Sequence, residues 1–311
     1  IRRIRVFIML SRAKTLLGDS RVDELTRMNI CIIGMGALGC AYADQLIRLG
    51  VKNFIIVDQD IVETSNLGRQ TLYAQGDIHQ LKVFAARDRL LSIATDTQIN
   101  CYPEHVTVDS LNDILQAHPI DLIIDGTDNF HTRFVINQLS LKYQIPWLYS
   151  ACIGRKGTVI PFFNNDRCLH CLFDYVPNTE DTCSTVGIIP PTVQFVVSIG
   201  VQLIIDNDHS DNMYYIDRLN LTKLPIPNRR EDCVSCHDGN FSYMEQSTDH
   251  IIKRCGDNIF ELSHTKMIQS IERHQVGDIW ITLFPNGRVM CHGARSGDEA
   301  TRALSSIKSK E

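Results

Sequence analysis

A glycine-rich turn carries the first residues that could do chemistry. The segment GMGALG, residues 34–39, matches G-x-G-x-x-G between an apolar run and a helical pattern. In such a turn Gly34 allows a tight bend, Gly36 lets the backbone approach a phosphate, and Gly39 permits close packing of helix on strand. The amide groups of the following helix N-terminus favour an anion. We interpret this loop as a nucleotide-binding site.

A polar stretch follows the loop and raises the question of which nucleotide is bound. Asp58 ends the next apolar run, where an acid that binds ribose hydroxyls is expected. The stretch DQDIVETSNLGRQ, residues 58–70, then adds Asn66, Arg69 and Gln70. A pyrophosphate carries about two negative charges, for which a helix N-terminus suffices, whereas a nucleoside triphosphate carries about four and comes with Mg²⁺. The triphosphate needs fixed cations and a carboxylate for the metal.

Further polar residues supply those cations and that carboxylate. Arg69 offers a bidentate guanidinium, and Lys82, on the next helical pattern, offers a second cation. Asp128, in GTDN at the end of a later apolar run, is a candidate magnesium ligand, with Asn129 beside it. Each of these residues taken alone is an ordinary solvated side chain. Together at strand ends around one glycine loop, where such folds bind ligands, they favour a nucleoside triphosphate with Mg²⁺.

Four cysteines form two C-x-x-C pairs and predict a metal site. The pairs are Cys168 with Cys171 in CLHC, and Cys233 with Cys236 in CVSC. Two such pairs are typical of a closed, structural Zn²⁺ site with four thiolate ligands. Because the pairs lie far apart in sequence, the metal would tie distant segments together. The alternative is four reduced cysteines in a core.

Strands alternate with helices over the first half of the chain and predict a mainly parallel sheet of the Rossmann type, hence the α/β class. The expected strands are 28–34, 51–58, 97–103, 120–128 and 145–151, and the expected helices are 37–50, 79–94 and 129–143.

An antiparallel extension is expected after this parallel half. Segment 157–163 predicts an antiparallel strand, 190–205 a helix opened by prolines, and 213–224 one or two further strands. A change of composition after Cys236 indicates a linker. We therefore expect a first domain over residues 1–237, tied by zinc, and a linker with a small αβ appendage over 238–311. The appendage would hold a hairpin at 278–293, turning at Pro285-Asn286-Gly287, and a helix near 297–307.

Composition excludes several classes of protein. The chain has 311 residues and a net charge of −5, which disfavours a nucleic-acid binder. No apolar run approaches the roughly 18 residues of a membrane span. Eleven cysteines in this pattern fit a reducing compartment, and we expect the cytoplasm. A nicotinamide-dependent oxidoreductase and a non-catalytic zinc scaffold are the alternatives from other classes; Arg69, Lys82 and Asp128 count against the oxidoreductase.

The motifs together resemble the ThiF/MoeB/HesA adenylyltransferases, relatives of ubiquitin-activating enzymes. The resemblance runs from GMGALGC and DQDIVETSNLGRQ through DGTDNFHTRF, IPWLYSACIGRKGTV and TCSTVGIIPP to CVSC, over about residues 10–237. One departure is G-A-L-G in the loop, where the family commonly has G-G-L-G. The family joins ATP to the C-terminal carboxylate of a small ubiquitin-like protein or a peptide and releases pyrophosphate.

The resemblance also implies roles for individual residues. It implies ATP contacts at Gly36, Asp58, Asn66, Arg69, Lys82 and Asp128, and we extend the expected nucleotide site to Gly34, Gly39, Asp60, Ser65, Gln70 and Asn129. The segment LSR at 10–12 implies that Arg12 acts in the neighbouring protomer's ATP site, hence a homodimer. Cys183, in EDTCSTVG, is either an acceptor of the activated acyl group or an unreactive loop cysteine. The expected partner is a small ubiquitin-like sulfur-carrier protein; the nearest alternative is a ribosomal peptide, as in microcin-type tailoring.

Overall fold

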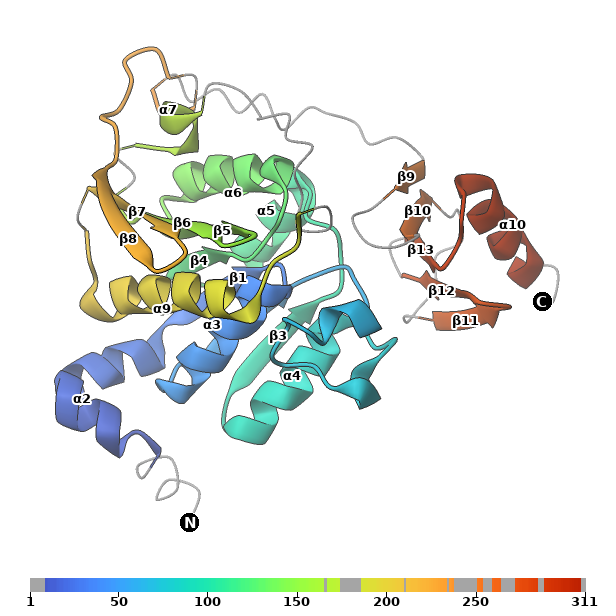
Figure 1. Cartoon of the computed structure of the whole chain (residues 1–311), viewed down its shortest axis with the longest axis horizontal. Coiled ribbons are helices and arrows are strands. Elements are labelled where there is room, and N and C mark those ends of the chain that lie inside the picture. The colour runs from blue at the N-terminus through green and yellow to red at the C-terminus, as the bar shows by residue number, and fades with distance from the viewer. Residues whose placement is uncertain are drawn as a thin grey trace. The chain divides into compact units, whose positions relative to one another are not determined.

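Two compact units, residues 1–244 and 245–311, make up the chain (Figure 1). The structure is a computed structural model, and it describes residues 9–164, 167–173, 186–209, 211–233, 235–237, 251–253, 259–263, 272–284 and 288–308. The predicted domain boundary after residue 237 stays a prediction, since 238–250 lie outside the described residues. None of the helices described is long and apolar enough to cross a membrane.

An eight-stranded sheet forms the centre of the first unit, in the order β3-β2-β1-β4-β5-β6-β7-β8. Its first five strands are parallel to one another, which confirms the predicted parallel half. They are β1 (Asn29–Ile33), β2 (Asn53–Val57), β3 (Gln98–Tyr102), β4 (Leu122–Asp125) and β5 (Trp147–Ile153). The chain runs outward from β1 to β3 and then returns to β4, so the order of strands reverses between β1 and β4. In open sheets of this kind ligands bind at that point.

The predicted antiparallel extension is also present. Strands β6 (Lys156–Phe162), β7 (Asn212–Asp217) and β8 (Asn220–Pro225) continue the sheet from β5, each antiparallel to its neighbour. A tight turn at Gly154, with φ of 57°, reverses the chain between β5 and β6. All residues of β8, the last strand of the sheet, are exposed.

Helices cover both faces of this sheet (Figure 1). Helices α3 (Ala37–Arg48), α4 (Lys82–Ile93) and α9 (Pro190–Asp206) lie on one face, and α5 (Val108–Ala117) and α6 (Phe130–Tyr143) lie on the other. Buried side chains of β1, β2 and β4 pack against α5 and α6 around the fully buried Phe134 and Trp147. A sheet buried on both faces explains why its strands read as continuous apolar runs.

The longer helices α2 (Ser11–Arg27) and α5 of the first unit were not predicted. Helix α2 is interrupted at Gly18, whose φ is 80°, and this break hides its helical pattern. Arg21 fixes it to the end of α9 by donating to the carbonyl oxygens of Ile204 and Ile205. Helix α5 begins at Thr107, whose side chain accepts from the Ser110 amide.

The second unit is a small αβ fold, as predicted. Five antiparallel strands follow the order β11-β12-β13-β10-β9, and α10 (Gly297–Lys308) completes the core with Ile281, Val289 and Ala300. The strands are β9 (Ile251–Lys253), β10 (Ile259–Ser263), β11 (Glu272–Val276), β12 (Ile279–Leu283) and β13 (Arg288–His292). The expected hairpin is β12–β13; its turn, 285–287, lies outside the described residues. Strands β9, β10 and β11 were not predicted.

Candidate nucleotide site and metal centre

The glycine loop lies between the carboxyl ends of β1 and β4. Gly34 has φ of +89°, and its carbonyl oxygen would lie 1.9 Å from a Cβ at Gly39 and 2.5 Å from a Cβ at Gly126. These contacts leave no room for side chains, so the loop must pack directly on the segment after β4. Gly36 differs, because a Cβ there would meet only the Gly126 oxygen at 3.9 Å. Because Gly36 has no side chain, the backbone at the start of α3 is left uncovered, and this suits the binding of a phosphate.

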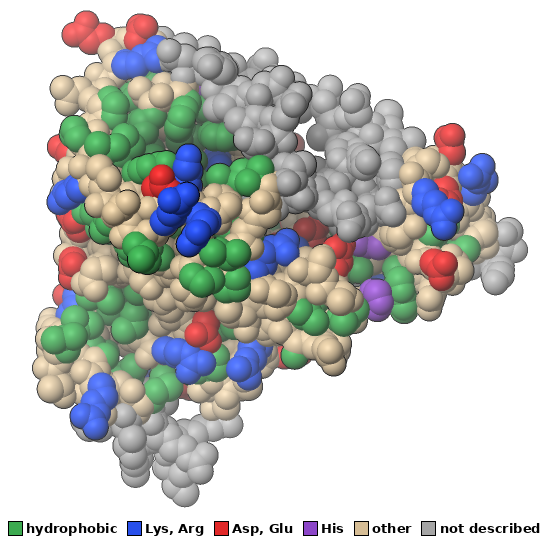
Figure 2. Space-filling view, in the orientation of Figure 1, with side chains coloured by type: hydrophobic (Ala, Val, Ile, Leu, Met, Phe, Trp, Pro, Cys, Tyr) green, Lys and Arg blue, Asp and Glu red, His purple; other side chains and the backbone are tan. Residues whose placement is uncertain are grey.

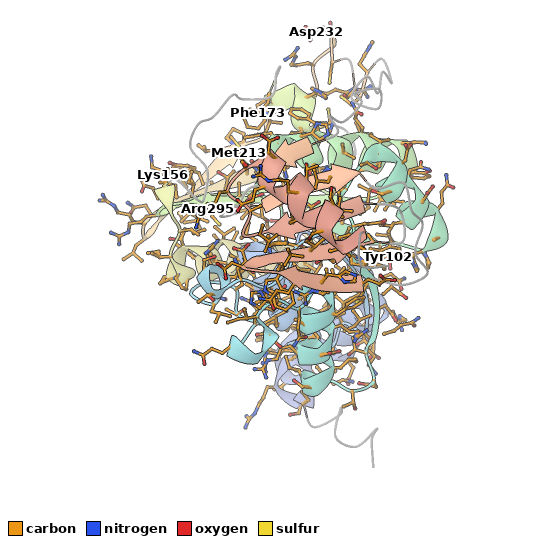
Figure 3. The ribbon with its side chains drawn as sticks, turned by 90° about the vertical axis from the view of Figure 1, so that its right-hand side faces the viewer. Tyr102, Lys156, Phe173, Met213, Asp232 and Arg295 are labelled. Atoms are coloured by element: carbon orange, nitrogen blue, oxygen red, sulfur yellow. The ribbon has the colours of Figure 1, made fainter. Side chains whose placement is uncertain are left out.

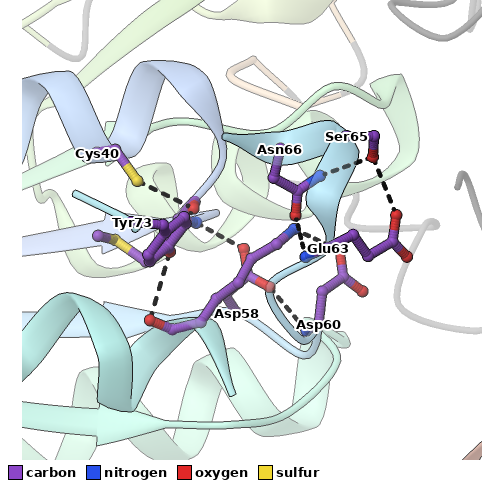
Figure 4. A network of polar contacts seen from close by, with 9 residues as sticks. Cys40, Asp58, Asp60, Glu63, Ser65, Asn66 and Tyr73 are labelled. Carbon is purple, nitrogen blue, oxygen red and sulfur yellow. Dashed lines mark hydrogen bonds and ion pairs between the residues drawn. The ribbon is translucent and has the colours of Figure 1, made fainter. Parts of the chain in front are cut away.

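Asp58 connects the glycine loop to the end of β2 (Figure 4). Its carboxylate accepts from the Met35 amide at 2.6 Å and from the Asp60 amide at 2.8 Å. Burial raises the pKa of Asp58 to about 6; the Lys82 charge opposes this rise, and Asp60 adds to it. An acid with this pKa is mostly ionised at neutral pH and can accept a ribose hydroxyl.

Lys82, at the start of α4, is a buried cation in the same network. Its ammonium group lies 2.9 Å from Asp60 Oδ2, and only 7% of the residue is exposed. Burial lowers the pKa of Lys82, but the charges of Asp58 and Asp60 outweigh that effect and raise it overall. Lys82 is therefore charged in the folded protein. The Tyr73 hydroxyl donates to the Met35 oxygen at 2.8 Å and holds the glycine loop close to this lysine.

The polar stretch after Asp58 folds into a short 3-10 helix, η1 (Thr64–Asn66), followed by a turn. The buried Asn66 uses its Oδ1 to accept from the Glu63 amide at 3.0 Å, so part of this side chain shapes the loop. Ser65 is exposed, and its carbonyl oxygen accepts from Arg69 at 2.8 Å. Gln70 is buried, and among the described residues its Oε1 has no hydrogen-bond partner.

The segment between β4 and α6 carries the other predicted ligands. Asp128 is exposed, so its carboxylate is available to a hydrated cation. Asn129 caps α6, because its Oδ1 accepts from the Thr132 amide at 2.8 Å. Gly126 packs on Gly34 and brings this segment against the glycine loop. An oxygen ligand at that edge is the donor type that Mg²⁺ prefers.

Two buried residues of this segment were not singled out from the sequence. Arg133 Nε lies 3.0 Å from Asp125 Oδ2, and both side chains are almost fully buried. Burial raises the pKa of Asp125, although the charge of Arg133 acts in the opposite direction. The signal was present in the sequence, because an acid at the end of an apolar strand and an arginine one helical turn into α6 are placed to meet.

Two predicted residues are not placed at this edge. Leu10 packs against Gly50, beyond the C-terminal end of α3, while the glycine loop lies at its N-terminal end. A helix of that length spans roughly 18 Å, so the exposed Arg12 lies far from the loop of its own chain. Cys183 lies outside the described residues.

The four paired cysteines meet in one cluster. Their sulfur atoms all lie within 4.8 Å of one another, and the separations that join Cys168 to Cys233 and Cys171 to Cys236 are 3.6 and 3.5 Å. Sulfur atoms around a tetrahedral Zn²⁺ would be about 3.8 Å apart, given Zn–S bonds of about 2.3 Å. The donor set and its spacing therefore fit zinc.

The environment of the cluster is that of a structural site. Cys168 directly precedes the short helix α7 (Leu169–Leu172) and Cys171 lies within it; the first amide of α7 donates to Asn137 Oδ1 of α6 at 2.7 Å. A hydrogen bond from Cys168 lowers the pKa of Cys171 to about 4. Four thiolates this close repel one another, so their joint ionisation calls for a cation. His170 is buried, and its ring Nδ1 is hydrogen-bonded to the Ser235 hydroxyl. The ring therefore supports the cluster without being one of the four ligands.

An apolar cavity of about 290 Å³ lies on the antiparallel part of the sheet. Its walls come from β5 to β8 and from the segment after α7; they include Tyr149, Ile160, Phe173, Met213, Tyr215 and Leu224. Figure 3 shows Phe173 and Met213 close together at this site. We refer to this hollow as the apolar cavity.

Basic side chains gather on the same strands (Figure 2). Arg155 and Lys156 in the β5–β6 turn, and Arg218 and Lys223 in the β7–β8 hairpin, are all exposed. The Arg218 amide donates to the Arg155 oxygen at 2.9 Å and joins the two turns. Lys223 points to the other face of β8, where its ammonium group lies 5.6 Å from the centre of the Tyr214 ring. We refer to the remaining three, Arg155, Lys156 and Arg218, as the basic rim. A surface of this kind suits an acidic partner with an apolar patch.

Comparison with known sequences places the chain among nucleotide-using enzymes. A sequence model described as "ThiF family" matches residues 10–233. The sulfur carrier protein ThiS adenylyltransferase of Bacillus subtilis is 32% identical over 315 residues, which cover 89% of this chain and 91% of that protein. The SAMP-activating enzyme E1 of Haloferax volcanii is 25% identical over 238 residues, covering 74% of this chain and 87% of the relative.

Solved structures show the same fold. Escherichia coli MccB in complex with MccA-N7isoASN superposes with a TM-score of 0.61, at 16% identity, over 70% of this chain and 69% of MccB. At that level of identity the likeness concerns the fold alone.

Proposed function

This chain belongs to the ThiF family, and from that premise we propose that it is an adenylyltransferase for a small ubiquitin-like sulfur-carrier protein. It would join the C-terminal carboxylate of the carrier to AMP from ATP and release pyrophosphate. One observation carries the proposal: the glycine loop, the Asp58–Lys82 network and the Asp128 segment meet at one edge of the sheet. A nicotinamide site would use the loop and Asp58 but has no need of the buried lysine or the second acid.

The chemistry requires positioning and charge, not a general base. A carboxylate with a pKa near 4 is already ionised at neutral pH and can attack the α-phosphate directly. The two reactants are both anions, so the enzyme must offset their repulsion and stabilise the departing pyrophosphate. We assign this work to the amides at Gly36, to Arg69 and to Lys82. Asp58 would hold the ribose, and Asp128 would hold Mg²⁺, which neutralises phosphate charge when bound.

The remaining nucleotide contacts follow from the same placement. Ser65, Asn66, Gln70 and Asn129 border the site, and we keep them as proposed contacts. Within the part of the chain that the structure describes, Gln70 Oε1 has no hydrogen-bond partner, but it is buried, so a donor on the nucleotide would reach it only after a local shift of this loop. Asp60 acts through Lys82, because its carboxylate holds the ammonium group in the resting protein.

The acceptor is proposed from the apolar cavity and the basic rim. The Tyr149 side chain lines the cavity, and its hydroxyl accepts from Arg133 NH1 at 3.4 Å, so cavity and nucleotide edge are neighbours. A folded carrier with an apolar patch and acidic surroundings would dock on this surface and send its C-terminus to the α-phosphate. The named relatives act on ThiS and on SAMP proteins, which supports a carrier of this class.

A peptide acceptor is the second candidate. The structural likeness to MccB with bound MccA favours it, but only through the fold. ATP–pyrophosphate exchange separates the two: we expect labelled pyrophosphate to enter ATP when a sulfur carrier is added. Deleting the last two residues of the carrier removes its terminal carboxylate from the site and should abolish exchange. If short peptides support exchange and sulfur carriers do not, the acceptor is a peptide and the carrier proposal is wrong.

Further parts of the proposal concern assembly and the fate of the acyl group. We propose a homodimer in which Arg12 serves the partner's site, and a zinc ion on the four clustered cysteines. The other cysteines of the described residues form no disulfide, which supports our proposal of a reducing compartment such as the cytoplasm. Cys183 stays a candidate acceptor of the acyl group. Cys183→Ser should then spare exchange and remove a later transfer step; full product without Cys183 would refute this role.

A further inference from the structure

Arg133 has every polar contact turned toward the protein. Its Nε donates to Asp125 at 3.0 Å, and one terminal nitrogen donates to the carbonyl oxygens of Thr127 at 2.9 Å and Ser150 at 3.3 Å. The other terminal nitrogen contacts the Tyr149 hydroxyl. Only 5% of Arg133 is exposed. A guanidinium group bound in this way does not reach a substrate, so any effect on the reaction acts through its neighbours.

Those neighbours are the backbone groups just before Asp128. The second Asp125 oxygen accepts from the Thr127 amide at 2.9 Å and from its hydroxyl at 2.6 Å. Thr127 is thus held at its N–H by Asp125 and at its C=O by Arg133. That carbonyl belongs to the peptide bond that links Thr127 to Asp128. On the other side of Asp128, Asn129 is fixed as the cap of α6.

We propose that Arg133, held by Asp125, is a positioning residue that sets the backbone of residues 126–128 so that the Asp128 carboxylate meets nucleotide-bound Mg²⁺. The inference rests on the proposed role of Asp128. It assigns Arg133 a part in the reaction without contact to either substrate.

The physical reason for an arginine here is geometric. A buried ion pair adds little net stability, because the loss of hydration offsets most of the attraction. The planar guanidinium, however, carries five donors in fixed directions and can bridge one carboxylate and two carbonyl groups at once. A lysine ammonium keeps the charge but cannot span these three acceptors. Lysine at position 133 should therefore preserve the ion pair and release the Thr127 carbonyl.

A small release at Thr127 would matter because of the packing around it. The adjacent Gly126 would collide with the Gly34 oxygen if either segment moved inward, since a Cβ there would lie only 2.5 Å from it. The segment therefore has little room to move toward the glycine loop, and a backbone released at Thr127 would shift away from that loop. Metal ligands whose supporting hydrogen bonds are removed typically bind their metal about 10- to 100-fold more weakly.

The test measures binding, so it needs no acceptor protein. Affinity for α,β-methylene-ATP is measured by calorimetry over a range of Mg²⁺ concentrations, for the parent chain, Arg133→Lys, Asp128→Asn and the double variant. Mg²⁺ should increase the affinity for the ATP analogue, and the midpoint of this increase gives an apparent Mg²⁺ affinity. We expect Arg133→Lys to shift that midpoint to a Mg²⁺ concentration about 10- to 100-fold higher. In the double variant Arg133→Lys should add little to Asp128→Asn, because both changes remove the same interaction.

Controls separate positioning from general damage. Arg48→Lys makes the same change in an exposed arginine that pairs with Asp44, and should match the parent chain. Asp125→Asn keeps the shape of its side chain and replaces Arg133→Lys if that variant does not fold. A normal Mg²⁺ response in Arg133→Lys, with only a lower unfolding temperature, overturns the proposal, as does full additivity with Asp128→Asn.

Failure of the proposed function gives a different pattern. If the parent chain binds the ATP analogue with Mg²⁺ but catalyses no pyrophosphate exchange with any carrier or peptide, the proposed function is refuted. The Mg²⁺ titration then still tests the proposed role of Arg133. A parent chain that does not bind the analogue refutes both.

Discussion

The ammonium group of Lys82 is already paired with Asp60, at 2.9 Å, in a position where only 7% of the lysine meets solvent. The cation proposed for the phosphates is therefore neutralised in the resting protein. A bound triphosphate would compete with Asp60 for this lysine. Lys82 consequently has a structural role as well as a proposed catalytic one, and the two can be measured separately.

Alanine at Lys82, Arg69 or Asp128 should lower adenylation about 10²- to 10³-fold each, because each change removes one fixed charge from the site. Only Lys82→Ala should also lower the free energy of unfolding, by on the order of 3 kcal/mol, since it leaves Asp58 and Asp60 together without a counter-charge. Exchange rates and urea unfolding measure the two effects. Arg87→Ala, on the same helix but half-buried and paired with the exposed Asp88, is the control. Near-normal exchange in all three variants would place the site elsewhere.

Nucleotide affinity should weaken as the pH falls through about 6, where burial places the pKa of Asp58. Protonation removes the acceptor proposed for the ribose, and the loss approaches about tenfold per pH unit below that pKa. Because the pKa is raised in the folded state, the same group favours folding at low pH and loses that contribution as the pH rises from about 4 to about 6. Binding of α,β-methylene-ATP is measured from pH 5 to 8. Asp58→Asn is the control, because in it only titration of the ligand changes the affinity with pH. The affinity of Asp58→Asn should depend less on pH than that of the parent chain; an equal dependence in both proteins contradicts the assignment.

Purified protein should contain one zinc ion per chain, held by Cys168, Cys171, Cys233 and Cys236. Cys233→Ser should reduce the zinc content to a small fraction and lower the unfolding temperature, because three thiolates do not close a tetrahedral site. Elemental analysis gives the stoichiometry. Cys101→Ser, a half-buried cysteine outside the cluster, should keep its zinc. Zinc that survives the loss of Cys233 would count against this set of ligands.

Mixing Arg12→Ala with Asp128→Ala should restore part of the activity that each variant lacks alone. The reason is the distance between Arg12 and the glycine loop of its own chain, which follows from the packing of Leu10 at the far end of α3. In a mixed dimer one of the two sites contains both native residues, Arg12 from one chain and Asp128 from the other. Each mixed dimer should therefore recover the activity of one site. Exchange activity is measured after subunit exchange has been verified by mass spectrometry. The doubly substituted chain mixed with itself is the control, and absence of any recovery argues for an arginine that is only a surface charge.

Local motifs could be predicted from the sequence because their chemistry depends on short spacings. The glycine loop and the two cysteine pairs are compact signals, and the structure shows the loop between strand and helix and the four sulfur atoms together. The alternation of apolar runs with helical patterns likewise predicted the parallel sheet.

Relations between distant residues could not be read in this way. The pairing of Lys82 with Asp60 joins residues 22 positions apart and depends on the course of the chain through η1. The Asp125–Arg133 pair lies within a single motif, but the exposed Asp128 carries the more evident chemistry there. Helix α2 was missed because Gly18 breaks its period, and β9 and β10 because they are short and are defined by pairing with one another and with β13.

The two cysteine pairs stand 65 residues apart, and the chain between them forms α9, β7 and β8. An ion that joins the pairs closes a loop of that length in the unfolded ensemble as well as in the fold, and the lost chain entropy corresponds to about 4 kcal/mol. The parallel strands that bear the glycine loop lie outside this loop. Removal of the ion would therefore loosen the antiparallel half, where the carrier is proposed to dock, while the parallel half keeps its own cooperativity. A chelator should therefore speed amide hydrogen exchange in the antiparallel half of the first unit, beyond β5, and leave exchange in the parallel half unchanged.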